Sequence, residues 1–495
     1  MQSLIHIENG VARMPQWQLK GPVTLDMCDG EQIAIVGDNG SGKTLLAANI
    51  TGAHPLYPGQ IAYDVTPSES SMVSDNLRYI TFKDCYGGDS ERTYFLQQRW
   101  NQQEIDENTP TTGALLEKEF LLTGPDTSAR REFQHNLYKL LHLEHLLDKY
   151  IILLSSGELR KFKLACALFC NPRVLMIDNP YIGLDIETRQ VLTEVLIGVI
   201  ASRPLLVILL LSRSDEIPPF ITHVIPVKEG VVGQKISLRD YKSQTASHAP
   251  ISLENHTIQV LSSLVTATPQ SIVSGEILRM HDVTVRYGRR TVLQSLSWVV
   301  HSGEHWLLTG RNGSGKSTLL SLICADNPQA YACDISLFGQ RRGSGESIWD
   351  IKHHIGYVSP EMHRAYRYDM TALQVVASGL KDTIGLYTRI TDEERETCKK
   401  WMDVFRISHL ATHRFTYLSD GEQRMILLTR AFVKSPALLI LDEPFHGLDN
   451  NNREWAMLII DAYCSMPHHT LIMVTHFKDE CPHVIDHYKE LEIQY

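Results

Sequence analysis

Runs of apolar residues divide this chain of 495 residues into two similar halves. Short, wholly apolar runs are typical of buried strands in a parallel sheet. They lie at 32–36, 173–178 and 205–211 in the first half and at 306–309 and 438–442 in the second. Residues 1–30 instead alternate apolar and polar positions between turn signals, which predicts antiparallel strands. The pattern therefore predicts an α/β fold that is built twice.

Helices are predicted between these strands. Residues 45–50 begin a helix, leucines recur at helical spacing over 137–147, and another helix extends to about Ser202. Residues 68–125 are polar and irregular, which predicts a helical excursion without firm boundaries. The polar stretch 230–275 has weak periodicity and is predicted to be a linker. The predicted domains are thus 1–229 and 276–495, joined by this linker.

Two glycine-rich turns follow apolar runs and precede helices. They are GDNGSGKT at 37–44 and GRNGSGKST at 310–318. Such a loop turns its backbone N–H groups around a β-phosphate, its lysine reaches the outer phosphates and its hydroxyl holds Mg²⁺. A chance glycine-rich turn is the alternative, but the same context occurs twice. The predicted nucleotide-binding residues are Gly37, Asn39, Gly40, Ser41, Gly42, Lys43 and Thr44, and Gly310, Asn312, Gly313, Ser314, Gly315, Lys316, Ser317 and Thr318.

Constant spacings show that the halves are a tandem repeat. The two loop lysines are 273 residues apart, whereas three later pairs are each 264 apart: Ser155 and Ser419, Asp178 and Asp442, and Asp185 and Asp449. Asp178 and Asp442 end apolar strands beside the loops, where a carboxylate is placed to hold Mg²⁺ together with Thr44 and Ser317. Each half also has an LSxGE segment: Ser155, Ser156, Gly157 and Glu158, and Ser419, Asp420, Gly421 and Glu422.

Composition narrows the class of protein. The net charge is −10, so the surface offers no basic field for nucleic acid, which makes nucleic acid an unlikely partner. Nine scattered cysteines without a CxxC pair suit a reduced, cytoplasmic environment. The greasiest run, 205–211, is far shorter than a membrane span, so we expect no intrinsic transmembrane segment.

The order of phosphate loop, LSxGE segment, apolar strand ending in Asp-Glu-Pro, GLD turn and terminal Thr-His closely resembles the ATP-binding cassette (ABC) ATPases. This resemblance implies two cassettes, each with an α/β core, an antiparallel β layer and a helical subdomain, using ATP and Mg²⁺. It also implies an intramolecular dimer docked head to tail, in which the LSxGE segment of one cassette, called the signature, closes over the ATP of the other. The run 338–359 is similar to tandem members grouped with molybdate import. A permease at the cytoplasmic face of the inner membrane is the implied partner.

The second cassette carries every catalytic part of the family. Lys316 would neutralise charge on the transferred phosphoryl group, Glu443 would position the attacking water, and His476 would contact the γ-phosphate. Tyr287 is a candidate to stack on adenine, with a packed strand tyrosine as the alternative.

The first cassette departs at two positions. Asn179 stands where Glu443 stands, and the sequence places Arg213 at the position of His476. An amide cannot accept a proton from water at neutral pH, so we predict that hydrolysis takes place mainly at the second site. The alternative is that another carboxylate takes over in the first site. Asp420 would add an anion facing the phosphates of that site unless it turns aside.

One further departure bears on partners. The family's glutamine after the strand 355–359 is replaced by Pro360 and Glu361, and Phe82 and Lys83 are the nearest counterparts in the first half. That loop normally touches the metal and the membrane partner, so coupling to a permease is in question. Two alternatives stay open: a soluble ATP-switched clamp acting on ribosomes or nucleic acid, and a tandem ATPase of the sugar-importer type.

Overall fold

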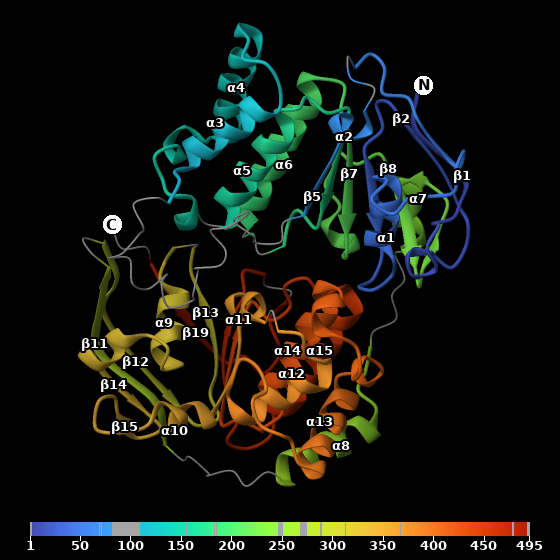
Figure 1. Ribbon diagram of the computed structural model, residues 1–495. Helices are drawn as coiled ribbons and strands as arrows, with labels where there is room; N and C mark the ends of the chain where they lie inside the picture. The colour runs from blue at the N-terminus through green and yellow to red at the C-terminus, as the bar shows by residue number, and fades with distance from the viewer. Residues whose placement is uncertain are drawn as a thin grey trace. The chain divides into compact units, whose positions relative to one another are not determined.

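Each half of the chain folds around its own parallel sheet in the computed structural model (Figure 1). The structure describes residues 2–492 except 69, 71, 82–108, 155, 183, 185, 246–250, 268–274, 288–289, 312, 367 and 478–479. The described residues fall into two units that divide between residues 249 and 250. The repeat predicted from the spacing of the motifs is therefore a repeat of structure.

The first unit combines an antiparallel sheet with a mainly parallel one. The antiparallel order is β2-β1-β4 and the larger sheet has the order β10-β8-β3-β7-β6-β5. The strands are β1 (Ser3–Gly10), β2 (Val23–Cys28), β3 (Ile33–Val36), β4 (Ile61–Tyr63), β5 (Leu77–Thr81), β6 (Val174–Asp178), β7 (Leu206–Leu211), β8 (His223–Lys228), β9 (Val231–Val232) and β10 (Ile236–Ser237). The helices are α1 (Lys43–Ile50), α2 (Val73–Asn76), α3 (Thr112–Leu122), α4 (Ser128–Leu141), α5 (Ser156–Leu168), α6 (Ile186–Ser202) and α7 (Leu238–Thr245).

The apolar runs of the sequence form the centre of this parallel sheet. Every residue of β3 and β7 is buried, as is β6 up to its terminal aspartate. One face packs on α1 and the antiparallel sheet, and the other on α5, α6 and the helical excursion. Strands covered on both faces have no polar side to present, which explains why these runs do not alternate.

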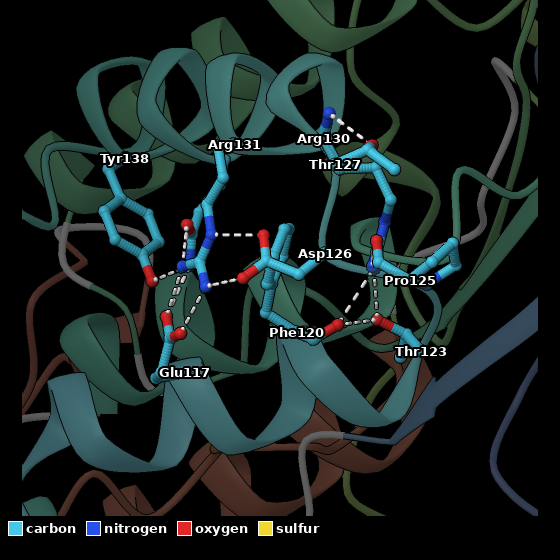
Figure 2. Close-up of polar contacts among 10 residues, drawn as sticks. Glu117, Phe120, Thr123, Pro125, Asp126, Thr127, Arg130, Arg131 and Tyr138 are labelled. Atoms are coloured by element: carbon cyan, nitrogen blue, oxygen red, sulfur yellow. Dashed lines mark hydrogen bonds and ion pairs between the residues drawn. The ribbon is translucent and has the colours of Figure 1, made fainter.

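The connection between α3 and α4 is held by ion pairs (Figure 2). Arg131 lies between two carboxylates, with Nη2 2.7 Å from Glu117 Oε1 and 2.7 Å from Asp126 Oδ2. Its hydrogen bonds lower the pKa of both carboxyl groups. Thr127 caps α4, and the guanidinium of Arg130 lies 4.2 Å from the centre of the Phe120 ring. Because α3 and α4 both pack on α5, this hairpin supports the helix on which the first signature lies.

The second unit repeats this architecture. Its antiparallel sheet has the order β12-β11-β14-β15 and its parallel sheet the order β16-β17-β18-β13-β19, which matches β5-β6-β7-β3-β8 of the first unit. The strands are β11 (Glu276–Tyr287), β12 (Arg290–His301), β13 (His305–Thr309), β14 (Asp334–Leu337), β15 (Gln340–Arg341), β16 (Ile355–Val358), β17 (Leu438–Asp442), β18 (Thr470–Val474) and β19 (His487–Glu490). The helices are α8 (Asn255–Ala267), α9 (Lys316–Ile323), α10 (Ile348–His353), α11 (Pro360–Ala365), α12 (Ala372–Ser378), α13 (Asp392–Val404), α14 (Asp420–Phe432) and α15 (Asn450–Cys464).

The stretch 230–275, predicted as a linker, contains regular elements of both units. Strands β9 and β10 pair with β8, and α7 packs beside them in the first unit. Helix α8 packs on α13 and α15 of the second unit, where Leu261 is fully buried. Weak periodicity concealed these elements because each presents only a few apolar side chains to its unit.

Gly356 marks the closest approach of β16 to α14. A Cβ atom at this position would lie 2.2 Å from Ala431 O and 2.6 Å from Pro436 Cγ. We expect Gly356→Ala to lower the free energy of unfolding by about 2 kcal/mol, because a packed core has no room for an added methyl group. Gly21→Ala is the matched control, since nothing lies within 4 Å of its added Cβ. Chemical denaturation measures both, and equal effects would contradict the prediction.

Candidate functional site

Both glycine-rich turns end in a lysine that begins a helix. Gly42 (φ +103°) precedes Lys43 of α1, and Gly315 (φ +95°) precedes Lys316 of α9. Lys43 Nζ donates to Gly37 O at 2.6 Å and to Asp38 O at 2.9 Å. Lys316 Nζ donates to the matching carbonyls, Gly310 O at 2.6 Å and Arg311 O at 3.0 Å. The two loops thus share one geometry, in which each ammonium group lies over its own loop.

The loops fit a bound phosphate and its magnesium ion. Ser41 Oγ and Ser314 Oγ are buried without a hydrogen-bond partner. Thr44 and Ser317 lie exposed in the first turn of the following helix, where a hydroxyl can bind a cation. A helix N-terminus and consecutive N–H groups provide the partial positive charge that phosphate requires. The residues present therefore suit MgATP at both loops.

An aspartate ends the strand beside each loop, as predicted. Asp178 is the last residue of β6 and Asp442 the last of β17. In the first unit, Tyr79 OH donates to Asp178 Oδ2 at 2.9 Å and Asn179 Nδ2 donates to Asp178 Oδ1 at 3.0 Å. These bonds hold the carboxylate that would face Mg²⁺.

Glu443 lies beside an imidazole in the second unit. Its Oε1 is 3.3 Å from His476 Nε2. Burial raises the pKa of Glu443, but the adjacent His476, together with His446 and Arg424, outweighs it and lowers the pKa to about 2. The side chain is therefore ionised at neutral pH and can accept a hydrogen bond from water.

Asn179 has the backbone of Glu443 without its charge. The φ angles are +45° and +47°, and the two N–H groups donate to Leu210 O and Val474 O, the residues that face each other in the two sheets' registers. Ser212 Oγ donates to Asn179 Oδ1 at 3.2 Å, at the place where His476 meets Glu443.

Arg213 is not the counterpart of His476, contrary to the sequence prediction. Because Leu210 corresponds to Val474, the residue that corresponds to His476 is Ser212. Arg213 is buried and its Nε lies 3.6 Å from Glu216 Oε1. The prediction aligned two strand ends by their polar residues alone, which allowed a shift of one position.

The second signature is a capped helix start. Ser419 caps α14 in a reciprocal pair with Glu422, and Asp420 and Gly421 form its first turn. In the first unit α5 begins at Ser156, with Gly157 and Glu158 following, and Glu158 Oε2 lies 2.7 Å from Lys149 Nζ. Ser155 and Asn312 lie outside the described residues, as do Phe82 and Lys83.

The segment that replaces the family's glutamine is bound to the signature helix. Ser359 is fully buried and caps α11, which begins at Pro360. His363 Nε2 lies 2.6 Å from Gln423 Oε1, one residue beyond the signature. A short helix thus takes the place of an open loop.

Each unit also holds an aromatic side chain near its phosphate loop. Asn327 Nδ2 donates to Tyr287 OH at 2.9 Å. In the first unit the ring of Trp17 stacks on His54, with centroids 4.3 Å apart and planes 1° apart. His54 and Asn327 are 273 residues apart, the spacing of the loop lysines, so the two pairs occupy equivalent places. Sequence analysis missed Trp17 because it lies three residues beyond the position that corresponds to Tyr287.

A family model described as "ABC transporter" matches residues 21–182 and again 293–446. The chain belongs to the ABC transporter family. Proteins of this family bind ATP with Mg²⁺ and hydrolyse it, and this member is of the tandem type, with two cassettes in one chain. The two cassettes coincide with the two units.

Two curated ABC proteins resemble the chain over almost its whole length. The ABC transporter ATP-binding protein ModF of Escherichia coli is 34% identical, covering 98% of this chain and 96% of ModF. An uncharacterised ABC transporter ATP-binding protein of Schizosaccharomyces pombe is 30% identical, covering 97% of this chain and 96% of its own. Among solved ABC structures, an archaeal ribosome recycling factor, aABCE1, in complex with the ribosomal stalk protein aP1, shares the fold. Its TM-score is 0.54 at 17% identity, with 97% of this chain and 87% of that chain covered.

Two features that would suggest other functions are absent from the described part of this ABC protein. None of its helices there combines the length and the apolar character needed to cross a membrane. Within the same residues, no three His, Cys, Asp or Glu side chains are grouped to hold a metal ion.

Proposed function

We propose that the protein is an ATPase whose two cassettes close head to tail on two MgATP molecules and that hydrolyses ATP mainly at the second site. One observation carries this proposal: Glu443 and Asn179 share one backbone conformation, but only Glu443 has an ionised carboxylate. The signature of each cassette would complete the nucleotide site of the other, as the capped start of α14 suits a phosphate acceptor.

At the second site each side chain has a distinct task. Lys316 supports the negative charge of the transferred phosphoryl group, and Glu443 orients the attacking water and draws on its proton. His476 fixes the carboxylate from the side and donates toward the γ-phosphate. Magnesium, when bound by Ser317 and Asp442, supplies further neutralisation of phosphate charge.

The first site would hold ATP without rapid turnover. Asn179 already donates to Asp178 and accepts from Ser212, so its amide is committed to neighbours. An amide has no basic lone pair for a water proton at neutral pH. ATP at this site would therefore act as a lasting connection between the cassettes.

The cellular role proposed is association with a transport system, and similarity to ModF supports it. Molybdate or a related oxyanion is the cargo that this similarity suggests. A permease would have to dock without the family's glutamine loop, on a surface that includes α11. The test is affinity purification of the Glu443→Gln variant, which should accumulate the ATP-closed form. A permease among the captured proteins would support the role, whereas ribosomal or DNA-repair proteins, or none, would contradict it.

Trp17 and Tyr287 are proposed to stack on the adenine rings of the first and second sites. We expect Trp17→Ala and Tyr287→Ala each to weaken ATP binding at one site about tenfold, since base–aromatic stacking is worth about 1–3 kcal/mol. Calorimetric titration of ATP into these variants in the Glu443→Gln background resolves the two sites without turnover. Phenylalanine at either position keeps the ring and should restore affinity. An unchanged titration would remove the stacking assignment.

A further inference from the structure

Arg424 is a fully buried arginine that lies between the signature helix and the catalytic strand. Only 1% of its surface is exposed. Its Nε donates to Pro444 O at 3.1 Å, and its Nη2 donates to Asp442 O at 2.9 Å and also to Glu443 O. Its Nη1 donates to Ser359 O at 3.1 Å. One guanidinium thus binds the carbonyl groups of three consecutive residues centred on Glu443.

The backbone held by these bonds is strained. Glu443 has φ +47°, a left-handed conformation that glutamate seldom adopts and that asparagine adopts much more readily. Such a residue persists where surrounding bonds determine its conformation. Bonds from a charged donor to carbonyl groups are among the stronger hydrogen bonds in proteins. The arginine therefore supplies a restraint at the residue whose side chain must meet water.

We propose that Arg424 is a positioning residue for ATP hydrolysis, which holds the Glu443 carboxylate in its productive place by fixing the backbone on both sides of it. It touches neither the nucleotide nor the water. Loss of the restraint would let the peptide of Glu443 relax, and the carboxylate would then move away from His476.

The first cassette offers a matched arginine. Arg160 is 264 residues before Arg424, lies at the same place after its signature, and is 4% exposed. It donates to Pro180 O at 2.9 Å and to Ile182 O, which lie beyond the strand end. Substitution at Arg160 therefore perturbs a buried arginine of the same kind in a cassette that has no catalytic carboxylate to position.

The experiment compares Arg424→Lys and Arg424→Gln with Arg160→Lys and Arg160→Gln in the full chain. We expect both Arg424 variants to lower kcat by about tenfold or more while KM for MgATP and the amount of retained ATP change by less than twofold, as expected when a group acts only in the transition state. The Arg160 variants should change kcat by less than threefold. Retained ATP and the thermal midpoint identify variants that fold, and kcat is compared for whichever Arg424 variant folds.

A double variant separates positioning from packing. The proposal rests on Glu443 as catalyst, so Arg424→Lys should lower turnover by less than twofold when Glu443→Gln is already present. An equal loss in both backgrounds, or an equal loss for the Arg160 variants, would show that Arg424 only supports the fold and would overturn the proposal. If Glu443→Gln itself leaves turnover unchanged, the assignment of the catalytic site fails instead.

Discussion

Replacing Glu443 by glutamine is expected to lower steady-state ATP turnover by about 100-fold or more while both ATP molecules stay bound. The amide keeps the shape of the side chain and its contact with His476 but loses the basic oxygen. The pKa of Glu443 lies at about 2, so the wild-type carboxylate is ionised throughout the neutral range and the loss should not depend on pH between about 6 and 8. Phosphate release measures turnover, and nucleotide extracted after gel filtration measures binding.

Asn179→Ala is the matched control for this prediction. Asn179 has the same backbone conformation and lies at the same strand end, but it has no charge to lose. Turnover should fall by less than threefold. A large loss in Asn179→Ala with none in Glu443→Gln would reverse the assignment of the two sites.

Replacing Lys316 by methionine is expected to abolish turnover, by about 100-fold or more, because the methionine cannot support charge on the transferred phosphoryl group. Lys316 is 8% exposed and its ammonium is held by Gly310 O and Arg311 O, so no other side chain can take its place without moving the loop. Phosphate release and bound nucleotide are again the measurements.

Lys43→Met provides the comparison, since Lys43 makes the same two contacts in the first loop. Each variant should retain one ATP per chain in place of two. Turnover of Lys43→Met should stay within tenfold of wild type, because that site serves as a connection rather than as a catalyst. Equal loss in the two variants would show that both sites hydrolyse ATP.

The sequence predicted those parts of the fold that local chemistry determines. The loops at Lys43 and Lys316 depend on glycine and on the order of strand, turn and helix, and the structure confirms two cassettes of the ABC fold. The buried strands could be recognised because a sheet covered on both faces admits only apolar residues.

Other features depend on register, which a single sequence does not specify. Ser212 rather than Arg213 faces Asn179 because β6 and β7 pair with Asp178 opposite Leu210. Trp17 comes from a segment outside any strand, and its place follows from contact with His54. Arg424 carries no motif, because its partners are carbonyl groups, which every residue has.

The shared left-handed backbone at Asn179 and Glu443 has an evolutionary consequence. When a gene doubles, one copy of an enzyme can stop turning over by exchange of a single side chain, with no rebuilding of the surrounding chain. Asparagine suits that twist better than glutamate does, so the retired centre rests in a more comfortable conformation than its ancestor. Silencing of this kind leaves the scaffold intact and available for a purely structural task.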